Sequence, residues 1–252
     1  MSGNEKKHLV LRGIKYLVRL VYPKMEIVGL ENLPDESCVI IGNHAQIHGP
    51  IACELYFPEN CYTWCAGQMM QLREVPAYAY ADFWSQKPGY TRPFFKVASY
   101  AIAPLAVLLF NNARTIAVHR DNRILNTFRD TIAKLKDGNS VVIFPEHDCK
   151  HNNIIYDFQE GFVDVAKLYY KATGKMLSFV PLYICPDLKK MCLGKPIWFS
   201  PDAPIARERR RICDYLMDEI TRMARALPRH TVIPYRNIPK KLYPKNIQEV
   251  RK

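Results

Sequence analysis

The chain has 252 residues and a mass of 29.2 kDa, which suits one α/β domain or a domain with an elaborate insert. Its 48% apolar content supports a sizeable core, and the 24% charged content is ordinary, so wholesale disorder is excluded. The net charge of +12 favours an anionic partner. Because we find no zinc-finger spacing, RNA-binding motif or basic heptad array, we expect anionic lipid and no nucleic acid.

Residues 1–24 predict a basic amphipathic helix. The apolar residues Val10, Ile14, Leu17, Val18 and Val21 recur at helical spacing, and Glu5 is the only acid among six basic residues: Lys6, Lys7, Arg12, Lys15, Arg19 and Lys24. Such a helix suits an anionic membrane surface. The alternative is a helix that packs on the protein's own core and leaves a solvated basic face.

The N-terminus lacks a signal-peptide pattern, and the eight cysteines are scattered without CxxC spacing. We therefore expect reduced thiols in a cytosolic compartment. No segment offers about 18 uninterrupted apolar residues, so we expect a peripheral protein on the cytoplasmic face of a membrane.

Short β-rich runs and helical stretches alternate along residues 25–227. We expect strands in the runs MEIVG, SCVIIGN, YTWCAG, TIAVHR, SVVIFP, LSFVPLYI and KPIWFS, and helices near residues 51–56, 124–135, 163–170 and 209–227. The last helix carries one apolar stripe of Ile212, Leu216, Ile220, Met223 and Leu227. This alternation predicts an α/β fold with a mixed central sheet covered by helices.

Two segments fall outside this alternation. Residues 68–112 form an aromatic and apolar insert, whose apolar run from residue 97 to residue 110 is broken by Pro104. The run suits an interfacial or re-entrant segment, and the alternative is a buried helix kinked at Pro104. Residues 228–252 form a basic tail rich in proline, which we interpret as a strap over the domain, a second membrane contact or a solvated tail.

Three strand ends carry residues that suit catalysis. Asn43 and His44 follow a β run and precede Gly49 and Pro50. Arg120 ends a second run, and Glu146 follows Phe144 and Pro145 at the end of a third. A histidine at a strand end can take a proton from an attacking hydroxyl, because its ordinary pKa is near 6.5.

These segments, with Val180 and Pro181 in a later strand, resemble the motifs of the glycerol-3-phosphate and lysophosphatidic acid acyltransferase family. That family has N-H-x-x-x-x-D, a Gly-x-aliphatic-x-x-x-Arg strand, F-P-E-G-T-R-S and an aliphatic-Pro pair, in this order. The resemblance covers roughly residues 25 to 200 and implies a glycerolipid acyltransferase-like fold with a role in phospholipid biosynthesis.

The resemblance also implies roles for the residues. His44 would be the general base that deprotonates a lipid hydroxyl, which then attacks the thioester of acyl-CoA or acyl carrier protein. No cofactor is expected, since the acyl donor is a substrate. Glu146 and Asp148 join His44 as catalytic candidates, and the candidates for substrate binding are Asn43, Arg120, Phe144, Pro145, Lys150 and Pro181.

The sequence departs from the family pattern at two places. Gly49 replaces the aspartate of the first motif, so His44 lacks the usual orienting carboxylate, and Asp148, Glu54, Glu146 or the neighbouring His48 are candidates to replace it. In the third motif, Cys149 stands where the family has arginine, and Lys150 or Arg120 are candidates to supply the missing charge. An amine or a neutral hydroxyl is therefore also a candidate acceptor.

Two other functions fit the same residues. One is a catalytically silent relative that binds lipid or acyl chains, which the missing aspartate favours. The other is a metal-dependent hydrolase that uses His44 and His48, since H-x-x-x-H is a zinc-ligand spacing. Ala45 stands where such hydrolases have their glutamate, and Gly49-Pro50 disfavours the helix that this spacing requires, so we expect no metal.

Overall fold

The computed structural model describes residues 3–58, 60–85, 87–119, 121–147, 154–235 and 238–247, with side chains from residue 12 onward. The chain forms two compact units. We call Lys24–Tyr62 with Thr131–Lys252 the sheet unit, and Met1–Pro23 with Thr63–Asp130 the helical unit. These units are defined by contacts within the fold. The sequence instead suggests a division by function, into residues 1–24, 25–227 and 228–252, and that division stays a prediction.

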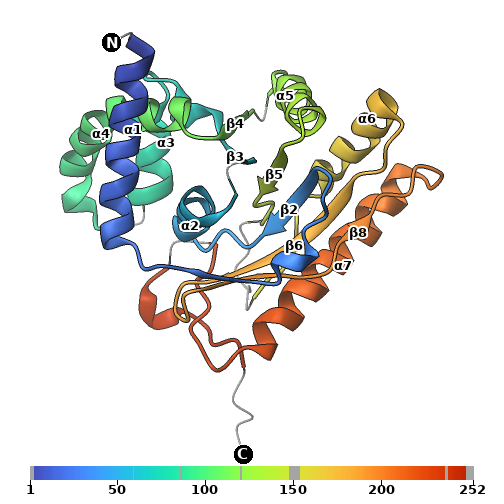
Figure 1. Ribbon diagram of the computed structural model, residues 1–252. Coiled ribbons are helices and arrows are strands. Elements are labelled where there is room, and N and C mark those ends of the chain that lie inside the picture. Colours follow the sequence, from blue (N-terminus) through green and yellow to red (C-terminus); the bar gives the residue numbers. More distant parts are fainter. Residues whose placement is uncertain are drawn as a thin grey trace, which may run out of the picture. The chain divides into compact units, whose positions relative to one another are not determined.

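The sheet unit holds a mixed sheet, so the predicted fold class is confirmed (Figure 1). Its strands are β1 (Glu26–Val28), β2 (Cys38–Gly42), β5 (Ser140–Ile143), β6 (Ser178–Cys185), β7 (Lys190–Leu193) and β8 (Ile197–Trp198). The order is β1-β7-β6-β2-β5, and β8 also pairs with β6. The pairs β2–β5, β2–β6 and β1–β7 are parallel, while β6–β7 and β6–β8 are antiparallel.

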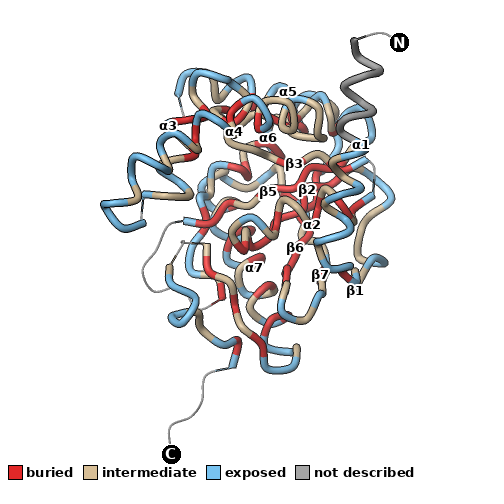
Figure 2. Tube along the Cα trace, turned by 90° about the vertical axis from the view of Figure 1, so that its left-hand side faces the viewer, coloured by how far each residue is buried: buried red, intermediate tan, exposed pale blue. Residues whose placement is uncertain are grey.

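The central strands form the core of this unit. Every residue of β2, β5 and β6 is buried, as Figure 2 shows. Strands buried on both faces read as continuous apolar runs rather than as alternating ones, which is why they are visible in the sequence. Within the central pairs, Ile41 lies opposite both Ile143 of β5 and Pro181 of β6. The ends of β2 and β5 therefore lie side by side.

Helices accompany the sheet. They are α2 (His48–Tyr56), α6 (Asp164–Thr173) and α7 (Ile205–Ala226), with 3-10 turns η1 (Leu30–Asn32), η5 (Glu160–Val163) and η6 (Lys240–Leu242). Helix α7 contacts β6 and buries Ile212, Leu216, Ile220 and Met223, as the apolar stripe predicts. Leu227 follows the helix and is only half-buried.

The chain crosses between the units after Pro23, within β3 (Cys61–Ala66) and within α5 (Ile124–Lys136). The helical unit further contains α1 (Gly3–Val21), η2 (Gly67–Met70), α3 (Val75–Ala79), the π-helical turn η3 (Tyr80–Trp84), η4 (Gly89–Thr91), α4 (Arg92–Asn112) and β4 (Thr115–Val118). Strands β3 and β4 pair in parallel. A small core joins α3 to α4 through Val75, Ala79, Ala103 and Ala106.

The insert forms a longer helix than its apolar run suggests. Residues Gly89–Asn112 are long and apolar enough to cross a membrane, and 17% of the most apolar window is buried. The sequence predicts no spanning segment, because its uninterrupted apolar run is short, but the helix continues through Lys96 and Arg92 at one end. Pro104 lies inside α4, as the kinked-helix alternative requires, but most of the helix surface is not covered by this chain.

The C-terminal segment, residues 228–235 and 238–247, folds onto the sheet unit and matches the strap interpretation. The hydroxyl of buried Tyr183 lies 2.7 Å from Nε2 of His230. The backbone N–H of His230 donates to Oδ1 of Asn246, whose Nδ2 donates to the carbonyl of Ala224 at the end of α7. Buried polar groups that are paired in this way fix a segment firmly, because breaking either bond leaves an unsatisfied partner.

Asn43 ties the end of β2 to β6, and this contact generates our first prediction. Its Nδ2 donates to the carbonyl of Ile184 at 3.0 Å, and its Oδ1 accepts from the N–H of Ile184 at 2.7 Å. Asn43→Ala should destabilise the protein by about 3 kcal/mol in urea denaturation, because both buried groups of Ile184 lose their partner. Asn126→Ala, at an exposed site on α5, should change stability by less than about 0.5 kcal/mol. Equal stability of the two variants would contradict this tie.

Candidate active site

His44 lies in a tight turn between β2 and α2. Ala45 and Gln46 both adopt left-handed backbone conformations, with φ of 46° and 55°. The N–H of His48 donates to the carbonyl of Ala45, and the N–H of Gly49 donates to the carbonyl of His44 at 3.0 Å. The turn therefore closes on His44 itself and starts α2 immediately afterwards.

Glu146 fixes this turn from the neighbouring strand. Its side chain is only 3% exposed, and Oε1 accepts a short hydrogen bond from the backbone N–H of His44. The loop around Glu146 is held in turn, because the N–H of Gln159 donates to the carbonyl of Pro145 and the N–H of His147 donates to the carbonyl of Asp157. Two residues 102 positions apart in the sequence thus meet at the carboxyl ends of β2 and β5.

Aromatic rings orient the imidazole of His44. Phe144 meets it edge-on at 5.3 Å between ring centroids, and Tyr235 of the C-terminal segment does so at 5.5 Å. The Phe144 ring also lies close to the Cα atoms of Gly42 and Gly49, where a Cβ atom would come within 3.2 Å and 3.1 Å of it. The ring of His44 is therefore held by packing on two sides.

The environment keeps His44 neutral. Burial lowers the pKa of the His44 ring to about 4, and hydrogen bonding with the backbone of Gln46 offsets part of this decrease. Nδ1 is fully buried and has no hydrogen-bond partner among the residues that the structure describes. At neutral pH the ring is uncharged and can accept a proton, but its basicity is below that of a free imidazole.

No described acid replaces the aspartate that the family pattern places near this histidine. Glu146 bonds to the backbone of His44 rather than to its ring. Asp148, Lys150 and Arg120, which we predicted from the sequence to contribute to the site, lie outside the described residues. Their roles stay predictions.

Gly49 shows why an aspartate does not fit in this turn. A Cβ atom at this position would lie 2.5 Å from the carbonyl oxygen of His44 and 3.1 Å from its carbon. The same carbonyl accepts the hydrogen bond from Gly49 that closes the turn. Any side chain at residue 49 would therefore require the backbone to move, so this turn requires a glycine at that position.

The other predicted binding residues occupy defined positions. Phe144 is half-buried against His44, and Pro145 is buried beside Glu146. Asn43 is buried, and both ends of its side-chain amide bond to Ile184. Pro181 is buried within β6, where its ring lies close to Gly194. Two contacts were not visible in the sequence, those of Tyr235 with His44 and of Tyr243 with Gln46, because both cross more than 190 residues.

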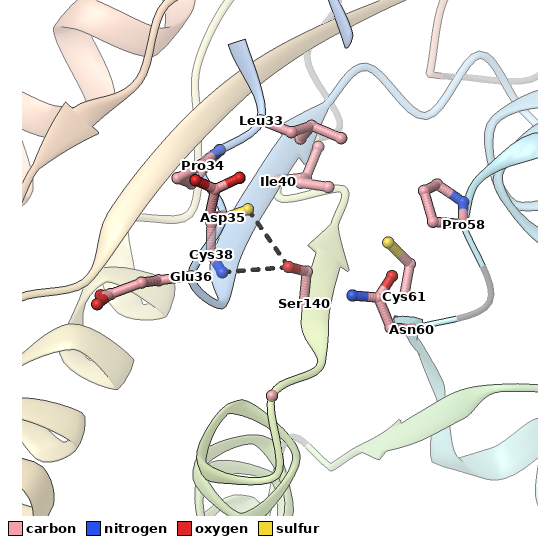
Figure 3. Close-up of a pocket in the computed structure, with 11 residues that line it drawn as sticks. Leu33, Pro34, Asp35, Glu36, Cys38, Ile40, Pro58, Asn60, Cys61 and Ser140 are labelled. Atoms are coloured by element: carbon pink, nitrogen blue, oxygen red, sulfur yellow. Dashed lines mark hydrogen bonds between the residues drawn. The ribbon is translucent and has the colours of Figure 1, made fainter. Parts of the chain in front are cut away.

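A separate pocket lies at the opposite edge of the sheet (Figure 3). It has a volume of about 270 Å³ and includes Cys38 and Ser140, which are the first residues of β2 and β5. The Sγ of Cys38 lies 3.4 Å from Oγ of Ser140, and burial raises the pKa of this thiol to about 11. Ligands of α/β sheets bind at the carboxyl ends of the strands, so we assign the active site to the edge with His44.

The geometry disfavours the metal alternative. His44 precedes α2 by four residues, and two of the three residues between it and the helix start, Ala45 and Gln46, are left-handed. His44 and His48 therefore do not face one side of a helix as H-x-x-x-H ligands do. Within the described residues, no three side chains of histidine, cysteine, aspartate or glutamate form a metal-binding group.

Gly49 generates a prediction for the turn. Gly49→Ala and Gly49→Asp should both destabilise the protein, by about 1–3 kcal/mol in urea denaturation, because each adds a Cβ against the carbonyl of His44. Both should also shift the NMR signals of the His44 ring. Gly161→Ala is the control, since a Cβ there meets nothing within 4 Å. If Gly49→Asp were as stable as the parent, the turn would tolerate the family's aspartate and our steric explanation would fail.

Comparison with known proteins supports similarity at the level of structure and not of sequence. No protein-family model and no curated protein matches the sequence. The fold is similar to the crystal structure of the 1-acyl-sn-glycerophosphate (LPA) acyltransferase PlsC from Thermotoga maritima, with a TM-score of 0.49 and 14% identity over 88% of this chain and 83% of that chain. This similarity is too distant to assign a function, so the functional proposal below rests on the residues of this chain.

Proposed function

We propose that the protein is an acyltransferase of phospholipid biosynthesis, which moves a fatty acyl group from acyl-CoA or acyl carrier protein to a hydroxyl of a lipid-like acceptor. The observation that carries this proposal is the joining of His44 and Glu146 at the carboxyl ends of neighbouring parallel strands. They belong to the sequence patterns Asn-His and Phe-Pro-Glu, whose order along the chain is that of the acyltransferase motifs.

The reaction needs one proton acceptor near the attacking hydroxyl. Neutral His44 takes the hydroxyl proton as the acceptor oxygen attacks the thioester carbonyl, and the tetrahedral intermediate then expels the donor thiolate. The imidazolium returns the proton to the thiolate, which balances the reaction as an ester and a free thiol. Since Nδ1 is buried, the acceptor approaches the other ring nitrogen, Nε2.

A catalytically silent relative that binds lipid is the second candidate, and it is favoured because Nδ1 has no partner within the described part of the chain. An orienting carboxylate is worth about four orders of magnitude in the serine protease triad. Here, packing by Phe144 and Tyr235 restricts the ring without adding charge. The two candidates differ in turnover, because only the enzyme releases free thiol from the donor.

Replacement of His44 tests the enzymatic proposal. His44→Ala should reduce acyl transfer by about 100-fold or more, because general base catalysis contributes 10²–10⁴-fold, while the far-UV circular dichroism stays unchanged. His147→Ala is the matched control, since this neighbouring histidine is exposed, and it should retain near-parental activity. The measurement is thiol release from acyl-CoA and from acyl carrier protein, each with a lipid extract as acceptor.

The pH profile belongs to the same test. The base must be deprotonated, so kcat/KM should fall only as pH drops through about 4 and should be level from about pH 5 to 8. An acid limb near 6.5 that disappears in His44→Ala would show that the ring is not desolvated in the working enzyme. No thiol release with any donor would favour the silent relative.

We further propose that the helical unit binds an anionic membrane surface and that the protein is peripheral on the cytoplasmic face. Phe94 and Val97 are each 70% exposed, and they lie on the face of α4 opposite buried Ser99, Ala103 and Ala106. Exposed apolar side chains also cover part of α1, namely Tyr16, Leu17, Leu20 and Val21. Such patches mark contact with a membrane or a partner.

Charge supports the membrane as that partner. The helical unit holds 13 lysine and arginine residues against 5 acids, a net charge of +8 out of the chain's +12. Exposed Arg92 and Lys96 begin the apolar helix α4. Since the inner face of α4 packs against α3, we propose that α4 lies in the interface rather than crosses the bilayer.

Vesicle co-sedimentation tests this surface. The protein should pellet with vesicles that contain anionic lipid and should be released by high salt, because exposed charges are screened within about 8 Å at physiological ionic strength. The double variant Phe94→Ser, Val97→Ser should bind about ten-fold more weakly, since it removes two apolar anchors. Leu125→Ser, which changes an equally exposed apolar residue on α5, is the control. Protein that resists both high salt and alkaline extraction would contradict the peripheral arrangement.

A further inference from the structure

A cavity of about 430 Å³ adjoins the His44 turn within the sheet unit. Six of its eight lining residues are polar, namely Gln46, His48, Asp187, Thr231, Lys240 and Tyr243. Gln46 and His48 belong to the turn that carries His44, and Asp187 follows the end of β6. The remaining three belong to the C-terminal segment. The cavity thus lies between the candidate catalytic turn and the segment that folds over it.

Hydrogen bonds fix the walls of this cavity. Nε2 of Gln46 donates to the Tyr243 hydroxyl at 2.9 Å, which joins the catalytic turn to the C-terminal segment. The N–H of Thr231 donates to Oδ2 of Asp187 at 2.7 Å, and Nζ of Lys245 donates to Oγ1 of Thr231 at 2.6 Å. The walls are therefore held in place independently of any ligand.

The cavity lining carries one lysine, Lys240, and one aspartate, Asp187. The backbone N–H of Thr231 and the nearby charge of Lys245 hold the carboxyl pKa of Asp187 below the ordinary value, so Asp187 is a carboxylate whose charge Lys245 offsets. Lys240 forms no ion pair with any described residue. It instead repels a proton from His48, whose pKa is lowered first by burial and then by the charge of Lys240. The cavity contains a cation that a bound anion would neutralise.

We propose that this cavity binds the phosphate ester of an anionic acyl acceptor, with Lys240 as the cation that holds it. Lysine suits this task, since its ammonium group is a point charge with three donors. Gln46 and His48 follow His44 by two and four residues, so a phosphate held here places the rest of the acceptor beside the base. The identity of the ligand as the acyl acceptor rests on the proposed function; the binding itself does not.

The test is a binding experiment that needs no turnover. The probes are inorganic phosphate, sn-glycerol 3-phosphate, hexanoyl lysophosphatidate and the uncharged hexanoyl glycerol, each titrated while the His48 ring signals are followed by NMR. The lysophosphatidate should bind and raise the pKa of His48, because its negative charge offsets Lys240. Inorganic phosphate and glycerol phosphate bound as tightly as the lysophosphatidate would identify free phosphate, not a lipid headgroup, as the ligand and would overturn the acceptor assignment.

Two lysines in the same short turn provide a matched pair. Lys240→Gln should weaken binding of the lysophosphatidate by about ten-fold or more, the usual effect of losing one charged hydrogen bond. Lys241→Gln should bind as the parent does, because Lys241 does not line the cavity. Lys240→Gln should also raise the pKa of His48 in the ligand-free protein, which checks that the variant has folded with the cavity intact.

The outcomes separate this inference from the enzymatic proposal. His44→Ala should still bind the lysophosphatidate through Lys240. If the parent protein binds the lysophosphatidate but shows no acyl transfer, only the enzymatic proposal is contradicted. Equal affinity of the parent and Lys240→Gln, binding of hexanoyl glycerol as tight as that of the lysophosphatidate, or no binding of any probe would each overturn the phosphate site.

Discussion

The hydrogen bond from the His44 backbone to the buried Glu146 carboxylate is the contact on which the rest of the site depends. It joins the ends of β2 and β5, which the sheet already brings side by side. A buried carboxylate is costly unless it accepts hydrogen bonds, so Glu146 and the turn stabilise each other. This constraint lets the chain leave β2 through two left-handed residues and still present the His44 ring in one orientation.

The same turn determines the chemistry of His44. Because Gly49 closes against the carbonyl of His44, there is no room for an acid at that position, and aromatic packing orients the ring instead. Packing restricts rotation as an acid would, but it desolvates the imidazole and lowers the pKa to about 4. In such a site the orientation of the imidazole ring is fixed, but its basicity is reduced. In the enzyme that we propose, such a site suits a reaction in which binding of the substrates, more than the strength of the base, determines the rate.

The sequence predicted the strands of the sheet and the meeting of His44 with Glu146, because β2, β5 and β6 are continuous apolar runs with polar residues at their ends. Strand β7 was missed because it has only four residues, Lys190–Leu193, and begins with a charge, although Pro186 and Asp187 lie in the turn before it. The left-handed position of that turn is Lys189, where glycine or asparagine would have been a clearer signal. Tyr235, Tyr243 and Lys240 were read as part of a tail, because no local pattern shows that Asn246 and His230 anchor this segment. The role of α4 was also underestimated, since its helix extends beyond the apolar run.

The distribution of charge is compatible with our two proposals, which give one basic chain two different anionic ligands. The helical unit carries +8 on a surface with exposed apolar helices, which is a diffuse attraction that salt screens and that selects no particular headgroup. The sheet unit carries only +4, and its cavity uses a single lysine between paired polar walls. A single charge in a cavity selects ligands whose own charge can reach it. Many exposed charges only raise the concentration of anionic ligands near a surface. Our proposals therefore assign attraction to the bilayer and choice of the acceptor to different parts of the sequence, so that each could change without the other.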